Sequence, residues 1–261
     1  MKAKLMFILI LVVVGKVASA EVSNDEMNKA NSPLTPMAAV NFHDYIQSSV
    51  FGTDETLNTA YLRIVSPMMI GGLPQLMRMT IPYMSAAPET PTSTTSGIGD
   101  VSIFDIFLLS KVDGVEFGVG PLLVMPTASK DETGAGKWQA GAAGIVMSPQ
   151  SWGMLGALIT YQHDFAGDSD RPTQNIATAQ PFLLWNLPQG IYLRSTGIMF
   201  FNWETGDYNI PLGAGIGKVW KFEGGTTMNL FGEPQWTAAH EGIYAPNFQT
   251  FVGLNFQFPL H

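Results

Sequence analysis

The chain has 261 residues, of which 46% are hydrophobic and only 13% charged, about half the charged share of an ordinary soluble domain. Its formal charge of −8 argues against a protein that neutralises nucleic-acid phosphates, so we expect no nucleic-acid partner. The sequence has no cysteine, which excludes disulfides, thiolate metal sites and cysteine nucleophiles. Its 27 glycines and 17 prolines argue against a coiled coil or a helical bundle.

Residues 1–20 have the pattern of a secretory signal peptide. Lys2 and Lys4 precede the apolar run 5–15, and the small residues 18–20 provide a cleavage site. This run is too short for the roughly 20 apolar residues that a membrane-spanning helix needs. Cleavage removes three of the 13 basic residues and no acid, which leaves 10 basic and 21 acidic side chains. We therefore predict an exported chain with a mature charge of −11.

The mature N-terminus, residues 21–39, is polar and shows no periodic pattern. A segment of this kind forms either a periplasmic tail or a plug that folds into a barrel lumen. The sequence leaves both alternatives open.

Beyond residue 39, apolar and polar residues alternate with a period of two, as in strands that have two different faces. In 76–83, for example, Met77 and Met79 alternate with Arg78 and Thr80. Many of these segments reach the 9–11 residues of a strand that crosses a membrane. The predicted strands, twelve in number, are 40–50, 58–66, 74–83, 100–110, 115–126, 138–147, 152–165, 174–186, 190–203, 207–220, 225–236 and 248–258.

The connections and the aromatic residues favour a membrane barrel. Long polar connections at 85–99, 127–137 and 237–247 alternate, with one exception, with short ones, as extracellular loops alternate with periplasmic turns. Aromatic residues gather near the strand ends, as in the girdles of membrane barrels. We therefore predict an all-β fold, a transmembrane antiparallel up-and-down barrel of about 12 strands over residues 40–261. The alternative is a secreted, soluble β-sandwich, which should carry a richer charged exterior.

Alternation directs a set of polar and ionisable side chains toward the lumen. A charge on the lipid side costs about 2–4 kcal/mol for arginine at mid-depth, so inward placement is expected. The first four charged members fall on four successive strands, where they could form a ladder that selects a solute or a salt-bridged filling that closes the barrel. The candidate lumen-lining residues are Arg63, Arg78, Asp105, Glu116, Asp164, Gln180, Arg194 and Glu233.

No motif supports catalysis or a cofactor. The glycine-rich run 213–218 lacks two residues of a phosphate loop, and no G-x-S-x-G motif is present. The four histidines show no metal-ligand spacing, and His163 falls on the outward face of its strand. We therefore expect no catalytic, cofactor-binding or metal-binding residues, and no enzyme.

The sequence resembles the MetA-pathway of phenol degradation family of outer-membrane proteins. The similar stretches run in order across nearly the whole mature chain. They are LNTAYLRIVSP at 57–67, MRMTIP at 77–82, GIGDV at 97–101, GVGP at 118–121, MPTA at 125–128, GAGKW at 134–138, QP at 180–181, NW at 202–203 and PLGAGIGK at 211–218. The resemblance implies an outer-membrane β-barrel associated with uptake of aromatic or hydrophobic small molecules, and it supplies no catalytic or binding residues.

These observations predict an outer-membrane barrel that passes a small solute passively. One alternative is a closed structural or adhesion barrel whose loops carry the function, and another is a barrel lipid hydrolase. The expected partners are the lipid bilayer, a small-molecule solute, periplasmic chaperones and the barrel-assembly machinery.

Overall fold

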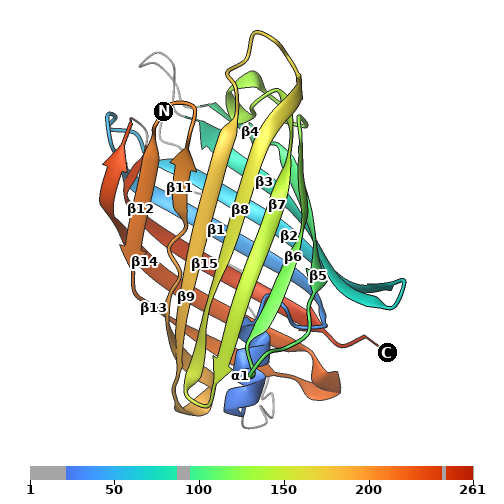
Figure 1. Cartoon of the computed structure of the whole chain (residues 1–261). Coiled ribbons are helices and arrows are strands. Elements are labelled where there is room, and N and C mark those ends of the chain that lie inside the picture. The colour runs from blue at the N-terminus through green and yellow to red at the C-terminus, as the bar shows by residue number, and fades with distance from the viewer. Residues whose placement is uncertain (1–21, 87–94, 243–244, 261) are drawn as a thin grey trace.

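The fold is a closed antiparallel β-barrel of twelve strands with a short helix at one end (Figure 1). The computed structural model describes residues 22–86, 95–242 and 245–260. The barrel expected from the alternating pattern is thereby confirmed. The predicted signal peptide and the middle of the predicted loop 85–99 lie outside the described residues.

Fifteen strand segments build the twelve barrel strands, because three barrel strands are each interrupted once. The interruptions separate β4 from β5, β10 from β11, and β12 from β13. In chain order the elements are α1 (Asn24–Asn31), β1 (Ala38–Val50), β2 (Leu57–Ile70), β3 (Leu73–Ala86), β4 (Thr95–Ile98), β5 (Val101–Leu108), β6 (Glu116–Met125), η1 (Asp131–Thr133), β7 (Lys137–Gln150), β8 (Gly153–Gly167), β9 (Asn175–Asn186), η2 (Pro188–Gly190), β10 (Ile191–Ser195), β11 (Met199–Asn202), β12 (Tyr208–Gly213), β13 (Gly215–Lys221), η3 (Glu223–Gly225), β14 (Thr227–Glu241) and β15 (Pro246–Phe258). Each of the twelve predicted ranges overlaps one barrel strand.

The barrel closes where the first strand meets the last. β1 pairs with β15 from Ala38 opposite Phe258 to Gln47 opposite Gln249, and its other edge pairs with β2. Every neighbouring pair is antiparallel, so each backbone edge in the ring has a partner. Because the sheet closes on itself, it has no edge strand with unpaired backbone groups.

The outward face of the barrel is apolar. Ile159 in the middle of β8 is more than half exposed, and so are Leu212 and Ile216 on either side of the interruption between β12 and β13. The exposed side chains of Trp138, Trp185 and Trp203 lie near strand ends as the sequence predicts, whereas the exposed Trp236 lies inside β14, which continues to Glu241. An exposed apolar band with aromatic residues near its borders is the surface that a membrane-spanning barrel offers to lipid.

Helix α1 lies at the end of the barrel where the short turns are (Figure 1). Ser23 caps it, because the Ser23 hydroxyl accepts a hydrogen bond from the Glu26 N–H while the Glu26 carboxylate accepts one from the Ser23 N–H. Asn24 and Asn28 donate to the carbonyls of Ser151 and Gln150 in the β7–β8 turn, at 2.7 and 2.9 Å. No helix in the described part of the chain is long and apolar enough to span a membrane.

The polar N-terminal segment, which the sequence predicts as either a tail or a plug, therefore packs against the barrel in its described part. Met27, Ala30 and Leu34 are at most 6% exposed and join the buried cluster inside the barrel with Tyr192 and Met147. Burial of the Met27 and Leu34 side chains, about 1.5–3 kcal/mol each, opposes undocking of the helix. Residues 22–37 narrow the lumen at the short-turn end.

Candidate functional site

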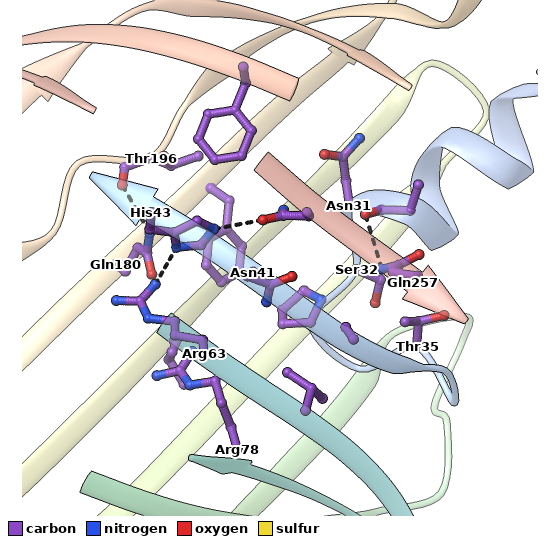
Figure 2. A pocket seen from close by; sticks show the side chains of 18 of the residues that line it. Asn31, Ser32, Thr35, Asn41, His43, Arg63, Arg78, Gln180, Thr196 and Gln257 are labelled. Carbon is purple, nitrogen blue, oxygen red and sulfur yellow. Dashed lines mark hydrogen bonds between the residues drawn. The ribbon is translucent and has the colours of Figure 1, made fainter. Parts of the chain in front are cut away.

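A cavity of about 150 Å³ lies inside the barrel, next to the segment that follows α1. Ser32 and Thr35 border it on the side of the segment after α1, Asn41 lies on β1, and Arg63 and Arg78 project from the neighbouring strands β2 and β3 (Figure 2). Apolar side chains complete its wall: Val65, Leu76, Phe104, Leu158, Phe182 and Leu184. The cavity thus combines fixed positive charge with an apolar lining.

Arg63, His43 and Asn255 form a chain of hydrogen bonds across three neighbouring strands. Arg63 Nη1 lies 2.7 Å from His43 Nδ1, and His43 Nε2 lies 2.9 Å from Asn255 Oδ1. A guanidinium can only donate, so Nδ1 accepts and the imidazole is neutral with its proton on Nε2. The His43 Nε2–H then donates a hydrogen bond to Oδ1 of Asn255. The chain fixes the position of Arg63, whose guanidinium also lies over the Tyr61 ring at 4.7 Å.

Arg78 has no polar partner among the described residues. Its guanidinium lies over the Phe104 ring, with 4.1 Å from Cζ to the ring centroid, and it makes no hydrogen bond or ion pair there. The Nε atoms of Arg78 and of Arg63 are both buried without an acceptor in that part of the chain. Two guanidinium groups in the same wall thus keep unused donors.

Arg194, in contrast, has a carboxylate that balances its charge. Its Nε donates to Glu233 Oε2 at 2.8 Å, and its Nη2 donates to the Thr196 hydroxyl at 2.6 Å. The Glu233 carboxylate also accepts from the Thr196 N–H and from Gln235, so all its acceptors lie in one network. The ring of Phe231 lies 3.4 Å below the Arg194 guanidinium. This network occupies the break between β10 and β11, where the Thr196 N–H bonds to a side chain instead of the sheet.

The cavity has an excess of positive charge. Three arginines line it, and none of its described lining residues is a carboxylate. Glu233 stands behind Arg194 and balances that one charge. Arg63 and Arg78 therefore remain the uncompensated charges, and buried charges normally pair.

The predicted lumen residues divide into two groups. Arg63, Arg78, Gln180 and Arg194 line the cavity, and Glu233 contacts it through Arg194. The remaining three, Asp105, Glu116 and Asp164, do not line the cavity, so Arg63, Arg78, Asp105 and Glu116 do not form a ladder across four successive strands.

Asp105 is a correction to the sequence-based expectation, because it lies on the outward face. Its neighbours Phe104 and Ile106 both face inward, and Asp105 pairs in register with Met77, between the inward Leu76 and Arg78. The stretch 101–108 carries apolar residues on both faces, so alternation alone does not show which face is inward. The prediction placed the single charged residue, Asp105, toward the lumen and therefore assigned the two faces the wrong way round. Phe104 faces inward because the lumen itself offers Arg78 as a partner for its ring.

Glu116 and Asp164 lie inward but near opposite ends of the barrel. Glu116 begins β6 at the short-turn end and pairs with Lys111 in the preceding turn. Asp164 lies near the long-loop end, where Oδ1 accepts from the Gln174 N–H at 2.7 Å and Oδ2 lies 3.9 Å from Lys137 Nζ. Neither lines the cavity.

Sequence reasoning missed His43 and the border formed by residues 30–37. Strict alternation in the range 40–50 places Asn41, His43 and Tyr45 on one face, and that signal was available. The packing of the polar segment onto the barrel has no comparable signal in the sequence, because it depends on contacts between residues more than 100 positions apart.

The described histidines do not form a hydrolase-like arrangement. His43 bonds to Arg63 and Asn255, His163 contacts the carbonyl of Asp164, and His240 stacks on Phe51. Within residues 22–86, 95–242 and 245–260, no hydrogen bond joins a histidine to a serine, and no group of three or more histidine or acidic side chains is arranged to hold a metal ion.

No family model matches the sequence, and no curated protein matches it. Solved structures do match. An outer membrane channel from Pseudomonas putida F1, of the family usually called MetA-pathway of phenol degradation, superposes with a TM-score of 0.61 at 14% identity over 85% of this chain and 94% of that one. This likeness shows that the two chains share a fold.

Two further structures are more distant. The outer membrane phospholipase A from Escherichia coli gives a TM-score of 0.45 at 11% identity, over 91% of this chain and 98% of that one. A mutant of the Rh. blastica porin gives 0.26 at 11% identity, over 85% and 99%. Likenesses at this level carry no argument about function.

Proposed function

We propose that the chain is an outer-membrane channel through which a small solute passes passively. The observation that carries this proposal is the polar, arginine-lined cavity inside a closed barrel whose outer face is apolar. A closed barrel with an apolar outer face is suited to span a membrane. Its lumen then offers a route between the aqueous compartments on the two sides. The shared fold with an outer membrane channel supports the proposal.

The proposal includes the location and the type of solute. The signal-peptide pattern and the apolar band support export to the outer membrane, with the bilayer, periplasmic chaperones and the barrel-assembly machinery as partners. The family resemblance and the apolar cavity wall support a solute with an aromatic or otherwise apolar part. Residues 22–37 narrow the route, so we expect low conductance.

Refolded residues 21–261 in liposomes and planar bilayers test the proposal. We expect reproducible ion conductance and solute-driven swelling from protein that also shows the heat-modifiable mobility of a folded barrel. A folded but silent barrel would contradict an open route and favour a closed structural role. Phospholipid hydrolysis by the same preparation, abolished by a serine and a histidine substitution, would instead favour the hydrolase alternative.

A further inference from the structure

We infer that the cavity at Arg63 and Arg78 is a binding site for a small organic carboxylate with an apolar body. The inference rests on the proposed function, because it names the class of solute that the lumen recognises. It is carried by four observations: the charge of the lining, the unused donors, the surrounding network that excludes Arg194, and the apolar wall.

The charge of the lining favours an anion. Arg63 is only 9% exposed. Its contacts are the neutral imidazole of His43 and the ring of Tyr61, and neither carries a negative charge that would compensate the guanidinium. Arg78 has an aromatic ring as its contact and no carboxylate. Since a buried charge is costly unless it is paired, an anion that enters the cavity supplies the missing partner for both groups.

The two arginines stand close enough to act on one ligand. Arg63 and Arg78 lie on the paired strands β2 and β3, where Val65 is opposite Arg78 and Arg63 is opposite Thr80. They are therefore diagonal neighbours on the inward face, a separation that long side chains bridge. In Figure 2 the two side chains lie side by side at the cavity. Their mutual repulsion is relieved by an anion bound between them.

The free donors specify a planar, bidentate acceptor. Arg63 and Arg78 each keep a buried Nε–H without an acceptor in the described chain. A guanidinium presents Nε–H and Nη–H in a fork whose spacing matches the two oxygens of a carboxylate. Arg194 does not compete equally for the ligand, because Glu233 already balances its charge, with Nε donating to Glu233 and Nη2 donating to Thr196. A carboxylate at Arg78 can extend toward Arg63 without disturbing that ion pair.

The remaining wall specifies the other part of the ligand. Val65, Leu76 and Phe104 flank the arginines, and Leu158, Phe182 and Leu184 lie across the cavity. The cavity volume of about 150 Å³ accommodates a body of the size of one six-membered ring. A fully hydrated inorganic anion would leave these apolar surfaces uncovered, so we expect a preference for the organic anion.

Binding of benzoate by isothermal titration tests the inference, with benzamide as the uncharged ligand of the same shape. The full mature chain is refolded in a zwitterionic detergent, and folding is verified by heat-modifiable mobility. We expect benzoate to bind at least about tenfold more tightly than benzamide and than inorganic phosphate. Equal affinities for benzoate and benzamide, or for benzoate and phosphate, would overturn the inference.

Variants locate the site. We expect Arg78→Gln to weaken benzoate binding at least about tenfold, Arg78→Lys to restore part of it, and the exposed loop substitution Lys130→Gln to leave it unchanged. Because Arg78 makes no hydrogen bond in the described chain, Arg78→Gln leaves no hydrogen-bond partner unpaired; it removes only the contact with the Phe104 ring, so the variant should fold. Unchanged benzoate affinity in folded Arg78→Gln would overturn the inference.

Transport and binding can fail separately. Swelling of vesicles in the uncharged sugar arabinose tests the channel without involving the arginines. Swelling without benzoate binding would overturn the carboxylate site and leave the channel intact. Benzoate binding by a barrel that neither swells nor conducts would support the site and contradict the channel.

Discussion

Arg194 and Glu233 form a buried ion pair, with 2.8 Å between Nε and Oε2 and side-chain exposures of 7% and 0%. The carboxylate also holds the backbone of Thr196 at the interruption between β10 and β11. The pair therefore fixes a break in the barrel wall and, at the same time, removes Arg194 from the set of free charges in the lumen. Its loss should affect stability more than recognition.

We expect Glu233→Gln to lower the stability of the barrel by about 3–5 kcal/mol, because it leaves Arg194 charged and buried without its partner. The measurement is urea-induced unfolding in lipid vesicles, followed by heat-modifiable mobility. Glu116→Gln is the matched control, since Glu116 pairs with a Lys111 side chain that is 68% exposed, and it should cost at most about 1 kcal/mol. Equal losses in the two variants would contradict this assignment.

Two glycines on β7 differ in the space around them. A Cβ at Gly141 would lie 1.8 Å from the carbonyl oxygen of Tyr161, whereas a Cβ at Gly144 would meet no atom within 4 Å. We expect Gly141→Ala to lose folded barrel in a refolding assay, because the β7–β8 ladder must separate locally. Gly144→Ala should refold as well as wild type. Comparable refolding yields would show that the strands can shift to admit the methyl group.

Docking of α1 should depend on pH through Glu26. The hydrogen bond from Lys221 Nζ, together with that from the Ser23 N–H, lowers the pKa of Glu26 below its ordinary value of 4.5. Because the folded-state pKa is the lower one, this contact stabilises docking at pH above 4.5 and is lost as the pH falls through the lowered value.

Hydrogen exchange of residues 24–31 measures this effect. We expect faster exchange at pH 3 than the intrinsic pH dependence accounts for, and Glu26→Gln should show the faster exchange already at pH 7. Exchange in Glu26→Gln that matches wild type at pH 7 would mean that the amide bonds to Ser151 and Gln150 hold the helix without Glu26.

The sequence predicts the barrel well because one face of each strand meets lipid and the other meets the lumen. Every predicted strand range overlaps a barrel strand, and Arg78 and Arg194 both lie on the inward face. The pattern fails at Asp105, where an apolar lumen removes the contrast between the two faces. It also cannot position α1, because the contacts of Asn24 and Asn28 depend on which turn the closed barrel brings beneath them.

The site itself is only partly predictable. Alternation identifies Arg63 and Arg78 as inward. It does not show that the acidic residues on the next two predicted strands, Asp105 and Glu116, lie away from the cavity. The charge excess of the cavity follows from the outward Asp105, the remote Glu116 and the pairing of Glu233 with Arg194. These placements depend on the three-dimensional structure. A count of the charges predicted to face inward suggests instead that the positive and negative charges in the lumen balance.

The most direct test is the ion conductance of the mature chain in planar bilayers, with reversal potentials recorded in a salt gradient. We expect reproducible openings with a preference for anions that falls in Arg78→Gln and persists in Asp105→Asn. The reason is that Arg78 faces the lumen, whereas Asp105 faces outward. Silence from a folded, heat-modifiable barrel would contradict passive passage through the lumen. An anion preference that changed in Asp105→Asn and not in Arg78→Gln would contradict the site.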